Sequence, residues 1–523
     1  MSSSSPYLTP SYDNALHLLS LLQSNKTVIN LFEASPNSNS DINASAIPEM
    51  KAWLSRAGYS PSDLAKLRCI HVAGTKGKGS VCTFTTSILK QYPTIAGKVG
   101  TYTSPHLASV RERICLDGES ISREKFVTYF YELWNKLSDA ARQDGVVVGV
   151  DEANNGLGVD GPSTKPFYFR FLTLLAFHAF LREGVKSAVI ECGIGGEYDS
   201  TNVLPADAVT ASVVTQLGID HVSMLGDTVQ KIAWHKAGIF KKGIPAYTYQ
   251  VIASGHGNPN ALEVMDGRAK ERETTLSALD DENHVKTWPG VPDAMLEGAF
   301  QKANMLLATA VARRHLQALG QKFDAPSFEN ARDLLPKDFK HLPEPIIRGL
   351  RTANILGRCQ TIREGPITWY LDGAHTEDSL TQVGKWYASK VSKGTVRVLV
   401  FNQQDRNSGK LLRTLLDTLQ AEMQIPDRRV FHHVICSTND FATTPVKPDM
   451  SVQEKNREVM VEFCPATEFD VTASVTAALD LVKYDIAKHA KDMEADLQLQ
   501  ILITGSFNLV GPALRLLDAH SEI

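Results

Sequence analysis

The segment HVAGTKGKGSV at residues 71–81 combines three glycines, two lysines and a serine hydroxyl within eleven residues. A buried strand is predicted before it and a helix at residues 77–90 after it, so the amides of the turn and of the first helical turn would point at one concave spot. We expect an anion there, with Lys78 reaching the β- and γ-phosphates of a nucleotide and Ser80 helping to hold Mg²⁺. The segment departs from the GxxxxGK(S/T) pattern, since Val72 occupies the first glycine position and an extra glycine separates the lysine from the serine. A glycine turn with solvated lysines is the alternative for this segment alone.

A carboxylate suited to a metal stands at Glu191, at the carboxyl end of the predicted buried strand SAVIECG. Open α/β sheets place their functional groups at such strand ends, and a buried carboxylate is costly unless it meets a cation or a hydrogen-bond donor. Mg²⁺ prefers oxygen ligands, so Glu191, the Ser80 hydroxyl and substrate phosphates would form a suitable shell. The GIGG that follows could also be part of a dinucleotide-binding turn, but it lacks the full GxGxxG spacing.

Three further residues could contribute to the same site. Asp220 and His221 follow another predicted buried strand, and Lys236 lies in the apolar helical segment IAWHKAGIF. A single histidine is commonly a structural residue and a single lysine is commonly on the surface. From the residues alone, the functional and the structural interpretations of His221 and Lys236 both stay open.

Short β-branched runs alternate with helical segments along the chain, which predicts an α/β fold with parallel sheets crossed over by helices. Uninterrupted apolar runs predict strands that are covered on both faces. In the first part these are residues 68–74, 187–193 and 208–218, and the intervening helices include residues 167–184 and 299–317.

A second series of strands and helices after residue 365 predicts a smaller doubly wound domain. Its strands are expected at residues 367–372, 395–402, 430–438 and 499–506, and its amphipathic segments at residues 409–423 and 471–490. The stretch 341–358, with two prolines and mixed charge, is the predicted hinge. Polar stretches at residues 34–48, 139–165 and 252–290 are predicted to be surface loops or insertions.

The composition limits the classes of protein that fit. A chain of 523 residues is too long for one core, and 43% hydrophobic with 21% charged residues is typical of a globular enzyme. The net charge of −4 gives no general attraction to nucleic acid. Seven scattered cysteines without a CxxC pair favour a reducing compartment and no thiolate metal site. We expect a cytoplasmic protein without a membrane span, because neither a targeting segment nor a sufficiently long apolar run is recognisable.

The chain resembles the folylpolyglutamate synthases, ATP-dependent ligases related to the Mur peptidoglycan ligases. Nine segments in family order, from about residue 50 to residue 512, carry this resemblance. They are HVAGTKGKGSV, TYTSPHLASVRERI, FYFRFLTLLAFHAFL, IECGIGGEYDSTNV, LGIDHVSMLGDTVQKIAWHKAGIFKKGIPAY, GAFQKANMLLA, GRCQ, WYLDGAHT and ILITGSFNLVG.

The resemblance implies an amino-terminal P-loop ATPase domain with a mostly parallel sheet at residues 1–350, and a smaller carboxyl-terminal Rossmann-like α/β domain at residues 351–523. The active site would lie in the cleft between them. The implied ATP contacts are Gly74, Thr75, Gly77, Lys78, Gly79, Ser80, Asn304, Arg358 and Asp372. The implied metal ligands are Ser80, Ser104, Glu191 and His221. The implied catalytic residues are Lys78, His221, Lys236 and His375. Lys236 matches a lysine that the family can carry as a carbamate, and His375 matches a residue linked to the incoming glutamate.

The implied reaction is addition of L-glutamate to the terminal γ-carboxylate of tetrahydrofolate and its polyglutamates through an acyl phosphate, which retains folates for one-carbon metabolism. The resemblance implies ATP, two Mg²⁺ ions and a monovalent cation as cofactors. We also expect a monomer, with a mitochondrial form from another start codon as an alternative to the cytoplasmic one.

Other functions compete with this prediction. Dihydrofolate synthase uses the same acyl phosphate chemistry on a pteroate, and the ATPase motifs do not separate the two activities. A nucleotide-dependent switch that ligates nothing is the alternative from a different class. A dinucleotide-dependent oxidoreductase is a weaker alternative, because the carboxyl-terminal part lacks the GxGxxG turn.

Overall fold

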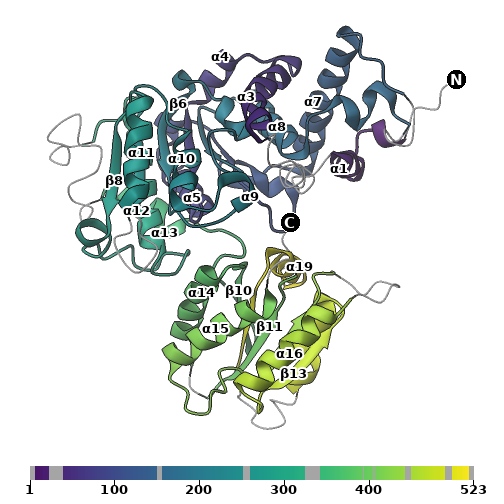
Figure 1. Cartoon of the computed structure of the whole chain (residues 1–523), viewed down its shortest axis with the longest axis vertical. Coiled ribbons are helices and arrows are strands. Elements are labelled where there is room, and N and C mark those ends of the chain that lie inside the picture. Colours follow the sequence, from purple (N-terminus) through teal and green to yellow (C-terminus); the bar gives the residue numbers. More distant parts are fainter. Residues whose placement is uncertain are drawn as a thin grey trace. The chain divides into compact units, whose positions relative to one another are not determined.

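The computed structural model describes residues 6–22, 39–149, 156–250, 259–323, 342–392, 394–404, 407–441, 449–488 and 498–517, and Figure 1 labels its elements. The chain forms two compact units. Unit 1 consists of Met1–His106, Val110–Ala294 and Gln301–Ala353, and unit 2 consists of Leu107–Ser109, Met295–Phe300 and Asn354–Ile523. Two short segments of unit 2 are therefore contributed from within the sequence of unit 1.

Unit 1 is built on a sheet that, within the described residues, has eight strands in the order β4-β3-β2-β5-β1-β6-β7-β8. The strands are β1 Cys69–Ala73, β2 Val99–Tyr102, β3 Ile114–Leu116, β4 Glu119–Ser120, β5 Ser187–Glu191, β6 Val209–Val214, β7 Ala246–Gln250 and β8 Leu276–Asp280. Two of the described pairs, β2 with β3 and β3 with β4, are antiparallel, and the other pairs are parallel. Every residue of β1, β5 and β6 is buried, as expected for strands covered on both faces.

Helices cover both faces of this sheet (Figure 1). They are α1 Tyr12–Leu21, α3 Asn39–Arg56, α4 Pro61–Leu64, α5 Lys78–Leu89, α6 Pro93–Ala96, α7 Arg123–Gln143, α8 Tyr168–Arg182, α9 Val222–Leu225, α10 Val229–Ala237, α11 Pro259–Glu271, α12 Gln301–Ala318 and α13 Glu344–Thr352. Helix α5 packs between β1, β5 and β2 on one side and α12 and α13 on the other. Cys69 belongs to a core shared with α7 and α8, and Ala73 to a core shared with α10 and α11. The strand that leads to the phosphate loop is therefore anchored along its whole length.

Unit 2 has a smaller sheet with the order β13-β12-β11-β14-β10-β9 in its described residues, parallel except for β9. The strands are β9 Gln360–Glu364, β10 Ile367–Asp372, β11 Val396–Phe401, β12 His433–Ser437, β13 Glu468–Thr472 and β14 Leu499–Thr504. The helices are α14 Glu377–Lys390, α15 Ser408–Met423, α16 Ser451–Phe463, α17 Val475–Asp480 and α19 Phe507–Leu517. Two apolar cores lie on the two faces of this sheet. The predicted α/β class, with one larger and one smaller mostly parallel sheet, is confirmed.

Side-chain caps fix where the helices nearest the predicted site residues begin. Thr228 precedes α10, and its hydroxyl accepts a hydrogen bond from the Lys231 amide. Thr376 precedes α14 and forms a capping box with Ser379. Such caps satisfy amides that have no partner within the helix, so they fix the residue at which each helix begins. The start of α10 in turn fixes the face of the helix on which Lys236 lies.

Parts of the predicted surface loops are regular structure. Residues 39–48 of the stretch 34–48 belong to α3, residues 139–143 of the stretch 139–165 end α7, and the stretch 252–290 contains α11 and β8. The polar composition misled the prediction because each helix has only one apolar stripe, which packs inward. The predicted hinge at residues 341–358 likewise contains α13, which packs against α5.

Among the described residues, no helix is both long and apolar enough to cross a bilayer.

Candidate active site

The loop between β1 and α5 has a shape that requires glycine at two positions. Gly74 and Gly77 have φ angles of 149° and 84°. A Cβ at Gly74 would lie 1.8 Å from Thr215 Oγ1, and a Cβ at Gly77 would lie 2.4 Å from Asn304 Oδ1. The Thr75 hydroxyl donates to the Gly218 carbonyl at 3.0 Å, which ties the loop to the chain after β6. The glycines are therefore needed for close packing as well as for the turn.

The amino end of α5 is suited to bind an anion. The helix begins at Lys78, and no described side chain caps it at Gly77. The first amides of an α-helix have no partner within the helix, and the helix dipole adds partial positive charge at this end. Together with the preceding loop, these amides form the kind of cradle that binds phosphate groups.

Lys78 lies between the loop and the end of the neighbouring strand. Its Nζ donates to the Gly74 carbonyl at 3.1 Å and lies 3.9 Å from Glu191 Oε1. The Glu191 carboxylate, which is 2% exposed, also accepts a hydrogen bond from the Ser104 amide at 3.1 Å. The structure thus brings together three predicted site residues, Lys78, Glu191 and Ser104, at the carboxyl ends of β1, β5 and β2.

Lys236 reaches the same loop from α10. Its Nζ donates to the Gly74 carbonyl at 2.8 Å, so two lysines share one carbonyl oxygen. Burial lowers the pKa of the Lys236 ammonium to about 7, and the charge of Lys78 lowers it as well. A lysine with this pKa is partly a neutral amine near neutral pH. Lys236 is therefore a buried lysine with a lowered pKa and not a surface lysine.

Two residues of α12 lie against the phosphate loop. Asn304, which was predicted, places its side-chain oxygen against Gly77 and donates from Nδ2 to Gln301 Oε1 at 2.9 Å. Gln301 was not predicted, and its Nε2 donates to Ser80 Oγ at 3.3 Å. Both side chains are buried. Gln301 and Asn304 stand three residues apart in the segment GAFQKANMLLA, so they share one face of the helix, and this spacing could have identified Gln301.

The oxygen atoms in this site fit Mg²⁺. The described residues contain no cluster of three or more His, Cys, Asp or Glu side chains that could enclose a metal. Mg²⁺ does not need one, since it is commonly held by one carboxylate, a hydroxyl, water and substrate phosphates. A Cβ at Gly79 would lie 3.9 Å from Glu191 Oε2, so this carboxylate faces the amino end of α5, where Ser80 lies. Glu191, Ser80 and Ser104 are the residues that would hold the ion.

His221 is on the chain that follows β6. It precedes α9 in a left-handed conformation with φ 50°, and its amide donates to Asp220 Oδ1 at 3.0 Å. Its side chain is 40% exposed. The charge of Asp220 opposes the lowering of the Lys236 pKa, which indicates that this chain passes near Lys236.

The remaining predicted residues form a second group in unit 2, at the carboxyl end of β10. Asp372 Oδ2 accepts from the Cys359 amide and Oδ1 from the Ala374 amide, both at 2.9 Å. Burial raises the pKa of the Asp372 carboxyl, and the charge of Arg358 is the largest opposing influence. This carboxylate therefore organises the two backbone segments around it.

An aromatic ring that was not predicted joins this second group. The Arg358 guanidinium lies 4.4 Å from the centre of the Phe507 ring, and the His375 ring lies 5.7 Å from it. A Cβ at Gly373 would lie 2.5 Å from Phe507. Phe507 starts α19 within the segment ILITGSFNLVG, where a single aromatic residue gave no periodic signal. Arg358 and His375 thus lie around one ring, which also packs against Gly373, the residue after Asp372.

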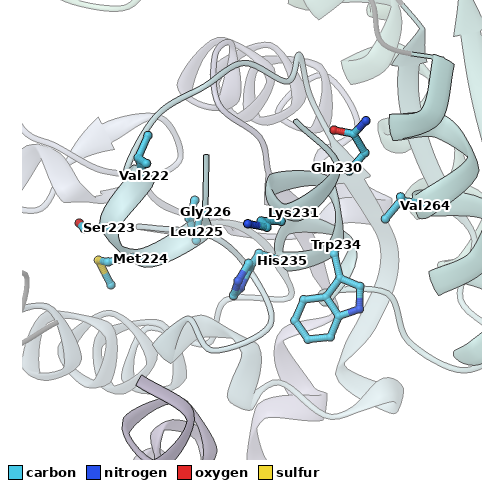
Figure 2. A pocket seen from close by; sticks show the side chains of 10 residues that line it. All are labelled: Val222, Ser223, Met224, Leu225, Gly226, Gln230, Lys231, Trp234, His235 and Val264. Atoms are coloured by element: carbon cyan, nitrogen blue, oxygen red, sulfur yellow. The ribbon is translucent and has the colours of Figure 1, made fainter. Parts of the chain in front are cut away.

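A pocket of about 510 Å³ lies between α9, α10 and α11 in unit 1. Figure 2 shows Val222, Ser223 and Met224 of α9 on one side, with Trp234 of α10 and Val264 of α11 on the other. The pocket is lined by Val222, Ser223, Met224, Leu225, Gly226, Gln230, Lys231, Trp234, His235 and Val264. His221 and Lys236, two predicted site residues, are next to lining residues in the sequence but do not line the pocket themselves.

A phosphate loop between a buried strand and a helix, a carboxylate at the adjacent strand end and a second α/β unit define an ATP-dependent ligase with a two-unit α/β fold. No protein-family model matches the chain. The chain is 39% identical to the folylpolyglutamate synthase of Neurospora crassa, with 97% of this chain and 91% of that protein covered. It is 37% identical to the folylpolyglutamate synthase of Saccharomyces cerevisiae, with 97% and 87% covered. The chain belongs to the folylpolyglutamate synthase family.

Solved structures support the fold. A Mycobacterium tuberculosis folylpolyglutamate synthase complexed with ADP and AMPPCP superposes with a TM-score of 0.65 at 23% identity, covering 90% of this chain and 95% of that one. A Thermotoga maritima folylpolyglutamate synthase gives a TM-score of 0.63 at 23% identity, covering 91% and 94%. At this identity the likeness establishes the arrangement of strands and helices, and the roles of individual residues need a separate argument.

Proposed function

We propose that this chain extends reduced folates by ligating L-glutamate to their terminal γ-carboxylate, at the cost of one ATP for each residue added. The arrangement at Gly74 is the observation that carries the proposal, because it combines a phosphate cradle with Lys78, Lys236 and the buried carboxylate of Glu191. Membership of the folylpolyglutamate synthase family supplies the substrate class.

The difficulty of the reaction lies in the carboxylate, which is a poor electrophile. In the proposed reaction, a γ-carboxylate oxygen of the folate attacks the γ-phosphorus of ATP, ADP leaves, and an acyl phosphate remains. The free amine of glutamate then attacks the acyl carbon, phosphate departs and the amine loses a proton. The protein's share is alignment of the reactants and neutralisation of charge.

Each residue of the unit 1 site has a role in this proposal. The α5 amides and Lys78 hold the phosphates, while Asn304 and Gln301 fix the loop and the Ser80 hydroxyl. Mg²⁺, held by Ser80, Ser104 and Glu191, would neutralise charge on the phosphates when bound. A second Mg²⁺ at His221 and a monovalent cation stay predictions that rest on the family resemblance.

Carbamylation of Lys236 is part of the proposal. Carbon dioxide reacts with neutral amines, and burial holds the pKa of Lys236 at about 7, so the amine is available near neutral pH. The product would replace a cation by an oxygen ligand beside the phosphate loop. Mass spectrometry in bicarbonate buffer, with Lys236→Arg as the control, tests this part separately from turnover.

The predicted residues of unit 2 have proposed roles of their own. The family resemblance assigns Arg358 and Asp372 to nucleotide contacts and His375 to the incoming glutamate. The contacts of Arg358 and His375 with Phe507 support a shared role for these two residues, whereas the two backbone amides on Asp372 favour a structural role for its carboxylate. The assignment of residues 1–350 to ATP binding and of residues 351–523 to glutamate ligation is part of the same proposal, as are a monomeric state and a cytoplasmic location.

Product analysis tests the function directly. The purified chain is given tetrahydrofolate monoglutamate, L-glutamate and Mg·ATP, and the products are analysed by mass spectrometry; stepwise addition of glutamate is expected. With ¹⁸O in the folate γ-carboxylate, one ¹⁸O atom should appear in the released phosphate. Lys78→Ala is the inactive control. Dihydropteroate in a parallel reaction identifies dihydrofolate synthase activity, whereas ATP hydrolysis that is independent of both folates would contradict the proposal.

A further inference from the structure

The loop that follows Glu191 is held by two arginines, one in α11 and one in the turn after it. Glu197 lies in this loop, and its carboxylate pairs with both Arg268 and Arg272. Arg272 Nη2 lies 2.7 Å from Oε1 and 2.9 Å from Oε2 of Glu197, so one nitrogen contacts both carboxylate oxygens. Hydrogen bonds between charged groups are stronger than those between neutral groups, so this contact helps to fix the Glu197 side chain.

Arg268 also holds a residue of α10. It is 6% exposed, and its guanidinium lies 4.4 Å from the centre of the Trp234 ring. A buried guanidinium is costly unless it is paired, and here it pairs with Glu197 and with Glu271 of its own helix. Arg268 therefore links three elements, namely the loop, α10 and α11.

The loop packs directly on the last turn of α10. The Glu197 amide donates to the His235 carbonyl at 2.7 Å. A Cβ at Gly196 would lie 2.7 Å from the His235 carbonyl oxygen and 2.8 Å from that of Lys236. Backbone meets backbone here without room for a side chain, so a shift of the loop must move the end of the helix that carries Lys236.

We infer that Arg268 of α11 and Arg272 of the turn after it are positioning residues for the ligase reaction, because they hold Glu197 and Trp234 and thereby fix the Lys236 side chain against Gly74 of the phosphate loop. Neither arginine belongs to the predicted site. The segment that bears them lies in a stretch predicted to be a surface loop. The inference rests on the proposed function for its activity measurement and on the structure alone for a second, chemical measurement.

A second anchor keeps the loop folded when the arginines are removed. Asp199 Oδ2 accepts hydrogen bonds from the amides of Gly193 and Ile194, at 2.9 and 3.0 Å. The buried Thr201 hydroxyl donates to Asp199 Oδ1 at 2.6 Å. Loss of the arginine pairing should therefore loosen the loop and α10 without unfolding unit 1.

The first measurement is steady-state ligation by the full chain carrying Arg268→Gln. A displacement of about 1 Å can cost up to about 100-fold in rate, so we expect kcat to fall about tenfold. The KM for ATP should change little, because α5, whose amides would hold the phosphates, packs mainly against α12 and α13. Lys270→Gln removes an exposed cation from the same helix and should leave both parameters unchanged.

A destabilised control separates positioning from simple loss of stability. Met265→Ala removes a buried apolar side chain of the same helix from the core that α10 and α11 share. It should lower the melting temperature while Arg268 keeps its contacts with Glu197 and Trp234. Below both melting temperatures, Met265→Ala should keep the kcat of the parent chain. An equal loss of kcat in Met265→Ala and Arg268→Gln would overturn the inference.

The second measurement is the reactivity of Lys236 itself. Acetic anhydride labelling at one pH, read by peptide mass spectrometry, should modify Lys236 several times faster in Arg268→Gln and in Glu197→Gln than in the parent chain. Unchanged labelling would overturn the inference. If neither the parent chain nor any variant ligates glutamate, the proposed function is wrong. The labelling comparison still tests whether the arginines position Lys236.

Discussion

Two carboxylates at strand ends, Glu191 in unit 1 and Asp372 in unit 2, have similar burial but different surroundings. Glu191 is 2% exposed and Asp372 is 4% exposed. Glu191 faces the Lys78 ammonium at 3.9 Å and one backbone amide, whereas Asp372 accepts a backbone amide on each oxygen. Burial at a strand end therefore does not by itself define the role of a carboxylate. Glu191 is placed to bind a cation, and Asp372 is placed to hold its own loop.

Removal of Lys78 should have the largest effect on the unit 1 site. Lys78→Ala takes away the cation that faces Glu191 and the phosphates, and we expect ligation to fall by at least about 1,000-fold. Circular dichroism and the melting temperature should stay close to those of the parent chain, because the side chain is partly exposed. Turnover within about tenfold of the parent would contradict the assignment.

Glu191→Gln changes only the charge of the unit 1 carboxylate. We expect ligation to fall about 100-fold, because an amide binds Mg²⁺ more weakly than a carboxylate does. Isothermal titration with Mg·ATP should show weaker binding of the complex. The fold should be retained, since the amide oxygen can still accept from the Ser104 amide. A stability loss without a change in Mg²⁺ dependence would make Glu191 a structural residue like Asp372.

Asp372→Asn tests the other side of the comparison. One end of the new amide would face a backbone N–H, and a buried donor left without an acceptor costs about 1–3 kcal/mol. We expect unit 2 to lose about 2 kcal/mol in urea unfolding and kcat to fall less than about tenfold. An inactive but fully stable variant would instead show that Asp372 acts on the nucleotide.

The pH dependence of stability tests Lys236 without any measurement of ligation. Burial lowers the pKa of Lys236 to about 7, while an unfolded lysine titrates near its ordinary value of about 10.4. Between these values the unfolded chain binds the proton and the folded chain does not, so stability rises with pH by up to about 1.4 kcal/mol per unit. This contribution is lost as pH falls through about 7. In bicarbonate-free urea unfolding, Lys236→Met should lack this slope; an identical slope would contradict the assignment.

The buried strands and the phosphate loop could be predicted because their sequence patterns lie in neighbouring residues. Buried strands such as β1 and β10 are uninterrupted apolar runs, and the glycines and lysines of the phosphate loop adjoin one another. Helix α3 was missed although Ala46, Met50, Leu54 and Ala57 recur at helical spacing, because the polar residues around them suggested a loop. The periodic signal was present and was outweighed by composition.

Other features required the fold. Gln301 resembles a surface glutamine until α12 is placed against Ser80, and Phe507 acquires its partners only when β10 and β14 pair. The same holds for Arg268, whose contacts join three elements that are far apart in the sequence. Contacts between distant segments leave no local pattern, so these residues could not be read from spacing.

The margins of the two sheets have a consequence for how this protein behaves at high concentration. Exposed strand margins can pair with other chains and start aggregation. Strand β4 is only two residues long, β9 ends on Arg363 and Glu364, and β13 carries Glu468 and Asp470. Short or charged margins discourage such pairing, so partly unfolded molecules should resist joining sheet to sheet through these three of the four described margin strands during refolding.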